Sequence, residues 1–198
     1  MKKIIALLLA LSCVFALAAC KNDAPPAADP IDDFVAAVAV SDPTSASITN
    51  SVTSDLLGLT LNGTYDVTYN EDGSATVAYS YDQLAEIDEN TTADELLYVV
   101  EGTATIAADG TVAGDVSGEV SAVAGVKLNL DKTKMTYSVS AGVLSATVKA
   151  ADTEAVLGVA IATDVTMTVS IANGTVSAVT LAFETTVGAA EIVCVYNY

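Results

Sequence analysis

Six carboxylates between residues 82 and 95 form the densest group of side chains in this sequence that could bind a metal ion: Asp82, Glu86, Asp88, Glu89, Asp94 and Glu95. Ca²⁺ takes roughly six to eight oxygen ligands, so an acidic loop can hold it. Asn70 and Asp72 match the first half of the ligand spacing in an EF-hand calcium loop. The second half does not match, since Tyr79 stands where that loop requires Glu. We interpret the segment as a solvated connection between strands, with a cation site as the alternative.

Five tyrosines fall in segments where apolar and polar residues alternate: Tyr65, Tyr69, Tyr79, Tyr81 and Tyr98. A tyrosine ring combines a large apolar surface with a polar hydroxyl, so an aromatic wall of this kind can face a ligand. Tyrosine at strand positions also packs routinely against its cross-strand neighbours. Both interpretations stay open at this point.

The common catalytic groups are missing from the sequence. It has no histidine, which excludes Ser-His-Asp and Cys-His sets and removes the commonest metal ligand. It also has no G-x-S-x-G elbow and no phosphate-binding glycine loop. Paired carboxylates of the glycosidase kind come from distant positions and stay open. We predict a protein that is not an enzyme and uses no cofactor or metal.

The first twenty residues have the layout of an export signal. Lys2 and Lys3 precede an apolar stretch that runs to Leu17 and is short for a membrane span. The residues that follow, Leu17-Ala18-Ala19-Cys20, resemble the bacterial lipobox, in which the cysteine becomes the lipidated first residue of the mature protein. The alternative is an ordinary cleaved signal with an incidental cysteine.

The lipobox resemblance implies a membrane-anchored protein outside the cytoplasm, in the periplasm or at the cell surface. We expect a signal peptide at residues 1–19, a lipidated Cys20 with a Pro- and Ala-rich tether to residue 30, and a folded domain at 31–198. With Cys13 removed and Cys20 lipidated, Cys194 is left without a disulfide partner. Its apolar sequence neighbours predict a buried, inert thiol.

The charge balance restricts the partners. Seven lysines, no arginine and 25 acidic residues give a net charge of −18. Nucleic acids and anionic lipid surfaces are bound through clustered cations, so both are disfavoured as partners. Protein partners are left undefined by the sequence.

The remaining residues predict a mainly β domain. A short helix begins near Pro30, with Ile31, Phe34, Val35 and Val38 on one apolar stripe. Period-two alternation then continues nearly to the end of the chain, including residues 112–120 and 159–171, with turns such as Asn173-Gly174. We expect about nine to eleven strands in one antiparallel meander. Because no long helix is predicted, the apolar face would close on itself as a barrel-like sheet, a curved half-barrel or a sandwich.

This order of elements resembles the lipid- and lipoprotein-carrier half-barrels of bacterial envelopes. The likeness rests on the helical segment from Phe34 to Val40 and on the hairpin of residues 57–69 and 74–81. It implies that the protein binds or carries a lipid or another hydrophobic ligand inside a curved sheet. The alternative is a structural or protein-interaction module of the envelope without a cavity. A carrier has an apolar cavity above about 300 Å³, whereas a scaffold is filled throughout.

Overall fold

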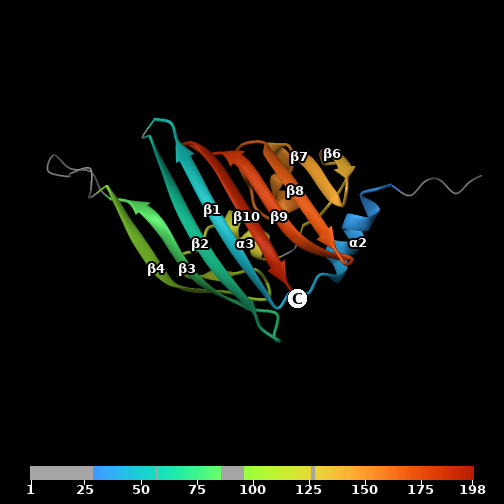
Figure 1. Cartoon of the computed structure of the whole chain (residues 1–198), viewed down its shortest axis with the longest axis horizontal. Helices are drawn as coiled ribbons and strands as arrows, with labels where there is room; N and C mark the ends of the chain where they lie inside the picture. Colours follow the sequence, from blue (N-terminus) through green and yellow to red (C-terminus); the bar gives the residue numbers. More distant parts are fainter. Residues whose placement is uncertain (1–28, 57, 86–95, 126–127) are drawn as a thin grey trace, which may run out of the picture.

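The computed structural model describes residues 29–56, 58–85, 96–125 and 128–198 (Figure 1). Within these ranges, ten strands form one antiparallel sheet. The strands are β1 (Ser45–Ser54), β2 (Leu59–Tyr69), β3 (Ala75–Leu84), β4 (Leu97–Ile106), β5 (Val112–Ala113), β6 (Met135–Ser140), β7 (Val143–Val148), β8 (Val165–Ala172), β9 (Thr175–Glu184) and β10 (Ala189–Asn197). The helices are α2 (Asp32–Val40), α3 (Gly118–Ala124) and α4 (Thr153–Leu157), preceded by the short 3₁₀ turn η2 (Ala150–Asp152).

The sheet is two meanders joined at its centre. Its strand order is β5-β4-β3-β2-β1-β10-β9-β8-β7-β6, so the first and last strands of the chain pair side by side. This confirms a mainly β domain with one antiparallel sheet and a short N-terminal helix. The sheet itself is open, with β5 and β6 at opposite edges, and it is neither closed into a barrel nor strongly curled (Figure 1).

Helices and connections cover one face of the sheet, and this explains why the sheet stays open. Helix α2 contacts β8 and β9, and α3 lies behind the central strands β1 and β10 (Figure 1). The apolar side chains of the strands on this face, such as Ile48, Val67 and Leu181, are almost fully buried. Burial under helices satisfies the apolar face, so closure of the sheet on itself is unnecessary.

The N-terminal helix forms where it was predicted, but with a different buried stripe. Ile31, Phe34 and Ala37 are buried, whereas Val35 is 46% exposed. Asp29 contributes to the start of the helix, because its Oδ1 accepts a hydrogen bond from the Ile31 N–H at 3.3 Å. At the other end, Ser41 donates to the Ala37 carbonyl and accepts from the Val176 N–H. Ser41 thereby ties the end of α2 to β9.

Two parts of the predicted strand pattern are not strands in the structure. Val120, expected in a strand, lies in α3, where the Ser117 side chain caps the first turn by accepting from the Val120 N–H. Residues 159 and 161, expected to begin the longest strand, precede β8 and follow α4. The valines at 112, 116 and 120 are spaced by four. This even interval fits a helix as well as a strand.

The other face of the sheet carries no helix among the described residues and is rich in hydroxyl groups. The pairing registers bring one row of Ser and Thr across the strands, interrupted by Val193 on β10: Ser80, Thr64, Thr49, Thr180, Thr168 and Ser145. Most strands therefore alternate between apolar residues toward the helices and polar residues toward solvent, whereas β4 and β10 also place valines on the solvated face. This is the pattern of a sheet with one buried and one solvated face.

Candidate functional site

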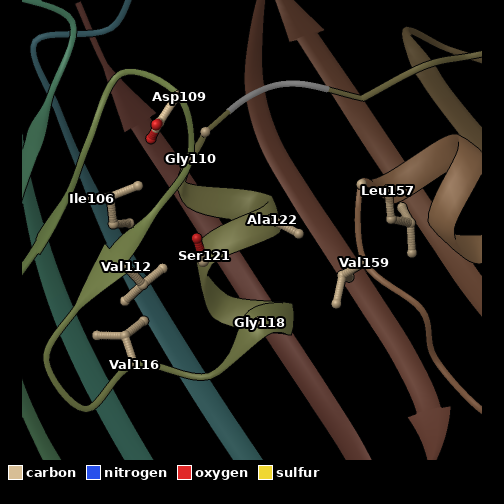
Figure 2. Close-up of a pocket in the computed structure, with 12 residues that line it drawn as sticks. Ile106, Asp109, Gly110, Val112, Val116, Gly118, Ser121, Ala122, Leu157 and Val159 are labelled. Carbon is tan, nitrogen blue, oxygen red and sulfur yellow. The ribbon is translucent and has the colours of Figure 1, made fainter.

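A half-open pocket of about 500 Å³ lies on the helix side of the sheet (Figure 2). Three parts of the chain form its walls: the β4–β5 hairpin with the segment after it, helix α3, and the end of α4 with the residues that follow. The lining residues are Ile106, Asp109, Gly110, Val112, Val116, Gly118, Ser121, Ala122, Gly125, Leu157, Gly158 and Val159. Asp109 and Ser121 are the polar side chains in this set, so the walls are mainly aliphatic or glycine.

The first wall is held by a tight turn. Ile106 pairs with Val112 across the β4–β5 hairpin. The turn between them is closed by the Ala107 N–H, which donates to the Thr111 carbonyl at 2.8 Å, and by the Thr111 N–H, which donates to the Asp109 carboxylate at 2.9 Å. Gly110 has a φ of +89°, a conformation that favours glycine at this position. The hairpin is thus a preformed wall.

The second wall is helix α3, which two tyrosines anchor to the sheet. The Tyr69 hydroxyl donates to the Ala124 carbonyl, and the Tyr196 hydroxyl donates to the Val123 carbonyl. These carbonyls lie in the last turn of the helix, where backbone acceptors lack helical partners. Burial raises the pKa of both tyrosines, so both hydroxyls keep the protons that they donate. Ser121 and Ala122 of α3 face the pocket (Figure 2).

The third wall depends on a buried threonine. Thr153 at the start of α4 has no exposed surface, and its Oγ1 accepts from the Ile161 N–H at 2.9 Å. The same hydroxyl lies 3.0 Å from the Ala150 carbonyl, to which it donates. Gly158 ends the helix in a left-handed conformation, with φ +77°. The Thr153 bonds fix the return of the chain that carries Gly158 and Val159 into the pocket.

Sequence reasoning did not find this pocket, because α3 was read as part of a strand and no helix was predicted at α4. One available signal was Ser117 followed by Glu119 and an apolar run, which is typical of a helix start. A second was Gly158 directly after Val156 and Leu157, which is typical of a helix end.

The five predicted tyrosines share the helix-side face but divide into different roles. The strand registers place them on this one face. Tyr69 holds α3, whereas Tyr65 is buried and Tyr98 is 47% exposed. Burial raises the pKa of Tyr65, and a hydrogen bond from the Asn50 side chain acts in the opposite direction. The rings of Tyr79 and Tyr81 lie near each other, with centroids 5.8 Å apart. None of the five lines the pocket.

Most of the predicted acidic segment lies outside the described residues. Asp82 is on β3, where its Oδ2 accepts from the Asn62 backbone N–H at 2.9 Å. The other five acids, Glu86, Asp88, Glu89, Asp94 and Glu95, are not described. In the described part of the chain, no three His, Cys, Asp or Glu side chains gather as a metal site would require.

The lipobox residues Leu17, Ala18, Ala19 and Cys20 also fall outside the described ranges. Among the residues that are described, no helix has the length and apolar character needed to cross a membrane. Cys194 is buried on β10, and this burial raises the pKa of its thiol to about 12. The thiol is therefore protonated at neutral pH, as expected of a structural cysteine.

The three lysines of the described residues are all engaged in ion pairs. Lys132 pairs with Asp29 at 3.1 Å, Lys134 with Asp152 at 3.2 Å, and Lys149 with Asp164 at 2.6 Å. These lysines do not line the pocket. Among the described residues, the pocket lining therefore carries no positive charge.

Comparisons with protein-family models, with curated proteins and with solved structures found no match for this chain.

Proposed function

We propose that this protein binds a hydrophobic or amphiphilic ligand without catalysis, while a lipid on Cys20 holds it at a membrane outside the cytoplasm. One observation carries the binding proposal: the half-open pocket of about 500 Å³ between the β4–β5 hairpin, α3 and α4. This volume falls within the range of roughly 300 to 1,000 Å³ that is usual for small-molecule sites.

The side chains of the pocket favour an apolar chain with a small uncharged or cationic end. Val112, Val116 and Val159 offer aliphatic contacts, and Ser121 offers one hydroxyl. Asp109 adds a carboxylate to a chain whose net charge is −18. An anionic headgroup would meet repulsion there. A neutral lipid or a comparable amphiphile fits this chemistry best.

Small residues line part of the pocket, so a larger side chain at one of these positions would fill it. Ala122 faces the pocket from α3, so the larger ring of Ala122→Phe would fill part of the space (Figure 2). Ala36 is an exposed alanine on α2, so Ala36→Phe is a matched control with the same change of size away from the pocket.

The test uses residues 21–198 and the neutral dye Nile red, followed by native mass spectrometry of protein isolated without detergent. We expect wild type and Ala36→Phe to bind the dye equally and Ala122→Phe to bind at least tenfold more weakly. An extractable adduct of several hundred daltons would identify the cargo class. Equal binding by Ala122→Phe, or no uptake of dye by the wild type, would contradict the pocket as a ligand site.

An envelope interaction module without a ligand is the second candidate. The hydroxyl-rich open face favours it, since this broad surface carries no helix among the described residues. A wild-type protein that takes up neither dye nor lipid, yet associates with another envelope protein through this face, would support the module.

A further inference from the structure

Strand β4, at one edge of the sheet beside the two-residue β5, exposes apolar side chains on both of its faces (Figure 1). Leu97, Tyr98 and Val99 stand in succession and are 38%, 47% and 58% exposed. The pairing register with β3 places Leu97 and Val99 on the open face and Tyr98 on the helix-side face. At the other edge, none of the six described residues of β6 is a large apolar side chain with such exposure. The exposed apolar surface therefore belongs to one edge of the sheet.

The backbone of β4 also points hydrogen-bonding groups away from the sheet. The Ala85 N–H donates to the Leu96 carbonyl at 2.9 Å, which makes these residues a hydrogen-bonded pair at the end of the β3–β4 ladder. Such pairs alternate along an antiparallel ladder, so the N–H and C=O groups of Leu97, Val99 and Glu101 point outward. Among the described residues, the strand on this side is β5, which pairs with the last two residues of β4 and leaves these groups uncovered.

This stretch of β4 lacks the features that usually protect an exposed sheet edge. Proteins prevent unwanted pairing at an edge with charged side chains, proline or a β-bulge. Residues 97–103 contain no proline, their pairing with β3 is regular, and their one charged side chain is Glu101. An apolar edge with one charge is typical of a strand that pairs with a strand from another chain.

We propose that β4 pairs with β4 of a second copy of this chain, antiparallel about a two-fold axis at Val99. A second copy fits because the axis brings the outward backbone groups of each strand onto the same groups of the other. Val99 then faces the partner's Val99, and Leu97 faces the partner's Glu101. Tyr98 faces the partner's Val100 on the helix side. The outward pairs would exchange about six backbone hydrogen bonds, since each pair exchanges two.

The charge of this stretch favours an axis at Val99. In this register the two Glu101 carboxylates lie four residues apart along the strands, about 13 Å. That distance exceeds the Debye length of about 8 Å at physiological ionic strength, so their repulsion is largely screened. An axis at Glu101 would instead place the two carboxylates directly opposite each other, which is destabilising. The axis uses the β4 edge of both copies, so the assembly ends at two.

Native mass spectrometry of the full chain, released from the detergent lauryl dimethylamine oxide, tests this pairing. We expect the wild type to be dimeric at micromolar concentration. Val99→Asp places two carboxylates opposite each other at the axis and should weaken the association at least tenfold. Val195→Asp is the matched control, because Val195 lies on the open face of β10, away from the edge, and is 47% exposed. This variant should remain as dimeric as the wild type.

Cysteine cross-linking keeps a folding defect from deciding the result. Val99→Cys retains a small side chain and places the two Cα atoms about 5.5 Å apart across the axis, a separation that a disulfide spans. Mild oxidation should join the two thiols in a covalent dimer, whereas Val195→Cys and the wild type, which controls for the chain's own cysteines, should not cross-link. A monomeric wild type, or a Val99→Asp variant that associates as the wild type does, would overturn the proposal. So would equal cross-linking of Val99→Cys and Val195→Cys.

Discussion

Replacing Thr153 by valine isolates the hydrogen bonds that fix the third wall of the pocket. Valine has nearly the shape of threonine but lacks the hydroxyl. Thr153→Val therefore leaves the Ile161 N–H, now bonded to Oγ1 at 2.9 Å, without its partner in a fully buried place. An unsatisfied buried donor costs about 1–3 kcal/mol of stability. We take about 2 kcal/mol as the expected loss in the free energy of unfolding.

Thr153→Ser provides the opposite change, because it keeps the hydroxyl and removes one buried methyl group. Loss of a buried methyl group costs about 1 kcal/mol. If packing alone stabilised this position, valine would be tolerated and serine would be the worse substitution. If the hydrogen bonds dominate, serine would be tolerated better and valine would be the worse substitution. The pair of variants thus separates the two contributions at one site.

Urea unfolding of residues 21–198, followed by circular dichroism, measures both variants. With a slope of about 2 kcal/mol per molar urea, Thr153→Val should lower the midpoint by about 1 M and Thr153→Ser by about half that amount. The melting temperature should fall by roughly 4–8 °C for the valine variant. A valine variant as stable as the wild type, or more stable than the serine variant, would refute the assignment of a structural hydrogen bond.

Three other substitutions or labels test separate features. Hydrogen bonds from Lys132, then Tyr137 and the Ile31 N–H, lower the pKa of Asp29 below 3.8, so the stability that Asp29 adds is complete above that pH and lost below it. The melting temperatures of wild type and Asp29→Asn should differ at pH 7 and approach each other as the pH falls further below 3.8. In residues 21–198, Cys194 should react with Ellman's reagent only after unfolding, and fast native labelling would contradict its burial. Cys20→Ala should abolish fatty-acid labelling and release the protein from membranes; persistent membrane attachment would count against the anchor.

The hairpins were predictable because their signals are local. Strict alternation over β2, β3, β8 and β9 marks one buried and one solvated face. Asn173-Gly174 then supplies the two positive φ angles, +54° and +83°, that a tight hairpin turn needs. Neither signal depends on distant parts of the chain, so residue pattern alone was sufficient. The pairing of β1 with β10 is different, since nothing local in either strand selects the other as its neighbour.

The pocket could not be predicted because short helices carry weak local signals. Helix α3 has seven residues and α4 has five, too short to be stable without tertiary packing. Their positions are set by contacts with distant residues, such as the bonds from Tyr69 and Tyr196 to the end of α3. The expected closure of the sheet followed from the same omission, since without α3 and α4 the predicted N-terminal helix was too short to cover the apolar face.

The segment between β5 and α3 ties one wall of the pocket to strand β3. Asp115 accepts a hydrogen bond from the Tyr81 hydroxyl, and the next residue, Val116, lines the pocket. This segment passes so close to β4 that a Cβ on Gly114 would lie 2.9 Å from the Ala104 Cα, and Gly114 also has a φ of +125°. Only glycine meets both demands without strain. Because the backbone is fixed at Gly114, the segment can present Asp115 toward Tyr81 and Val116 toward the pocket. The bond between Tyr81 and Asp115 thus helps to hold the wall that carries Val116.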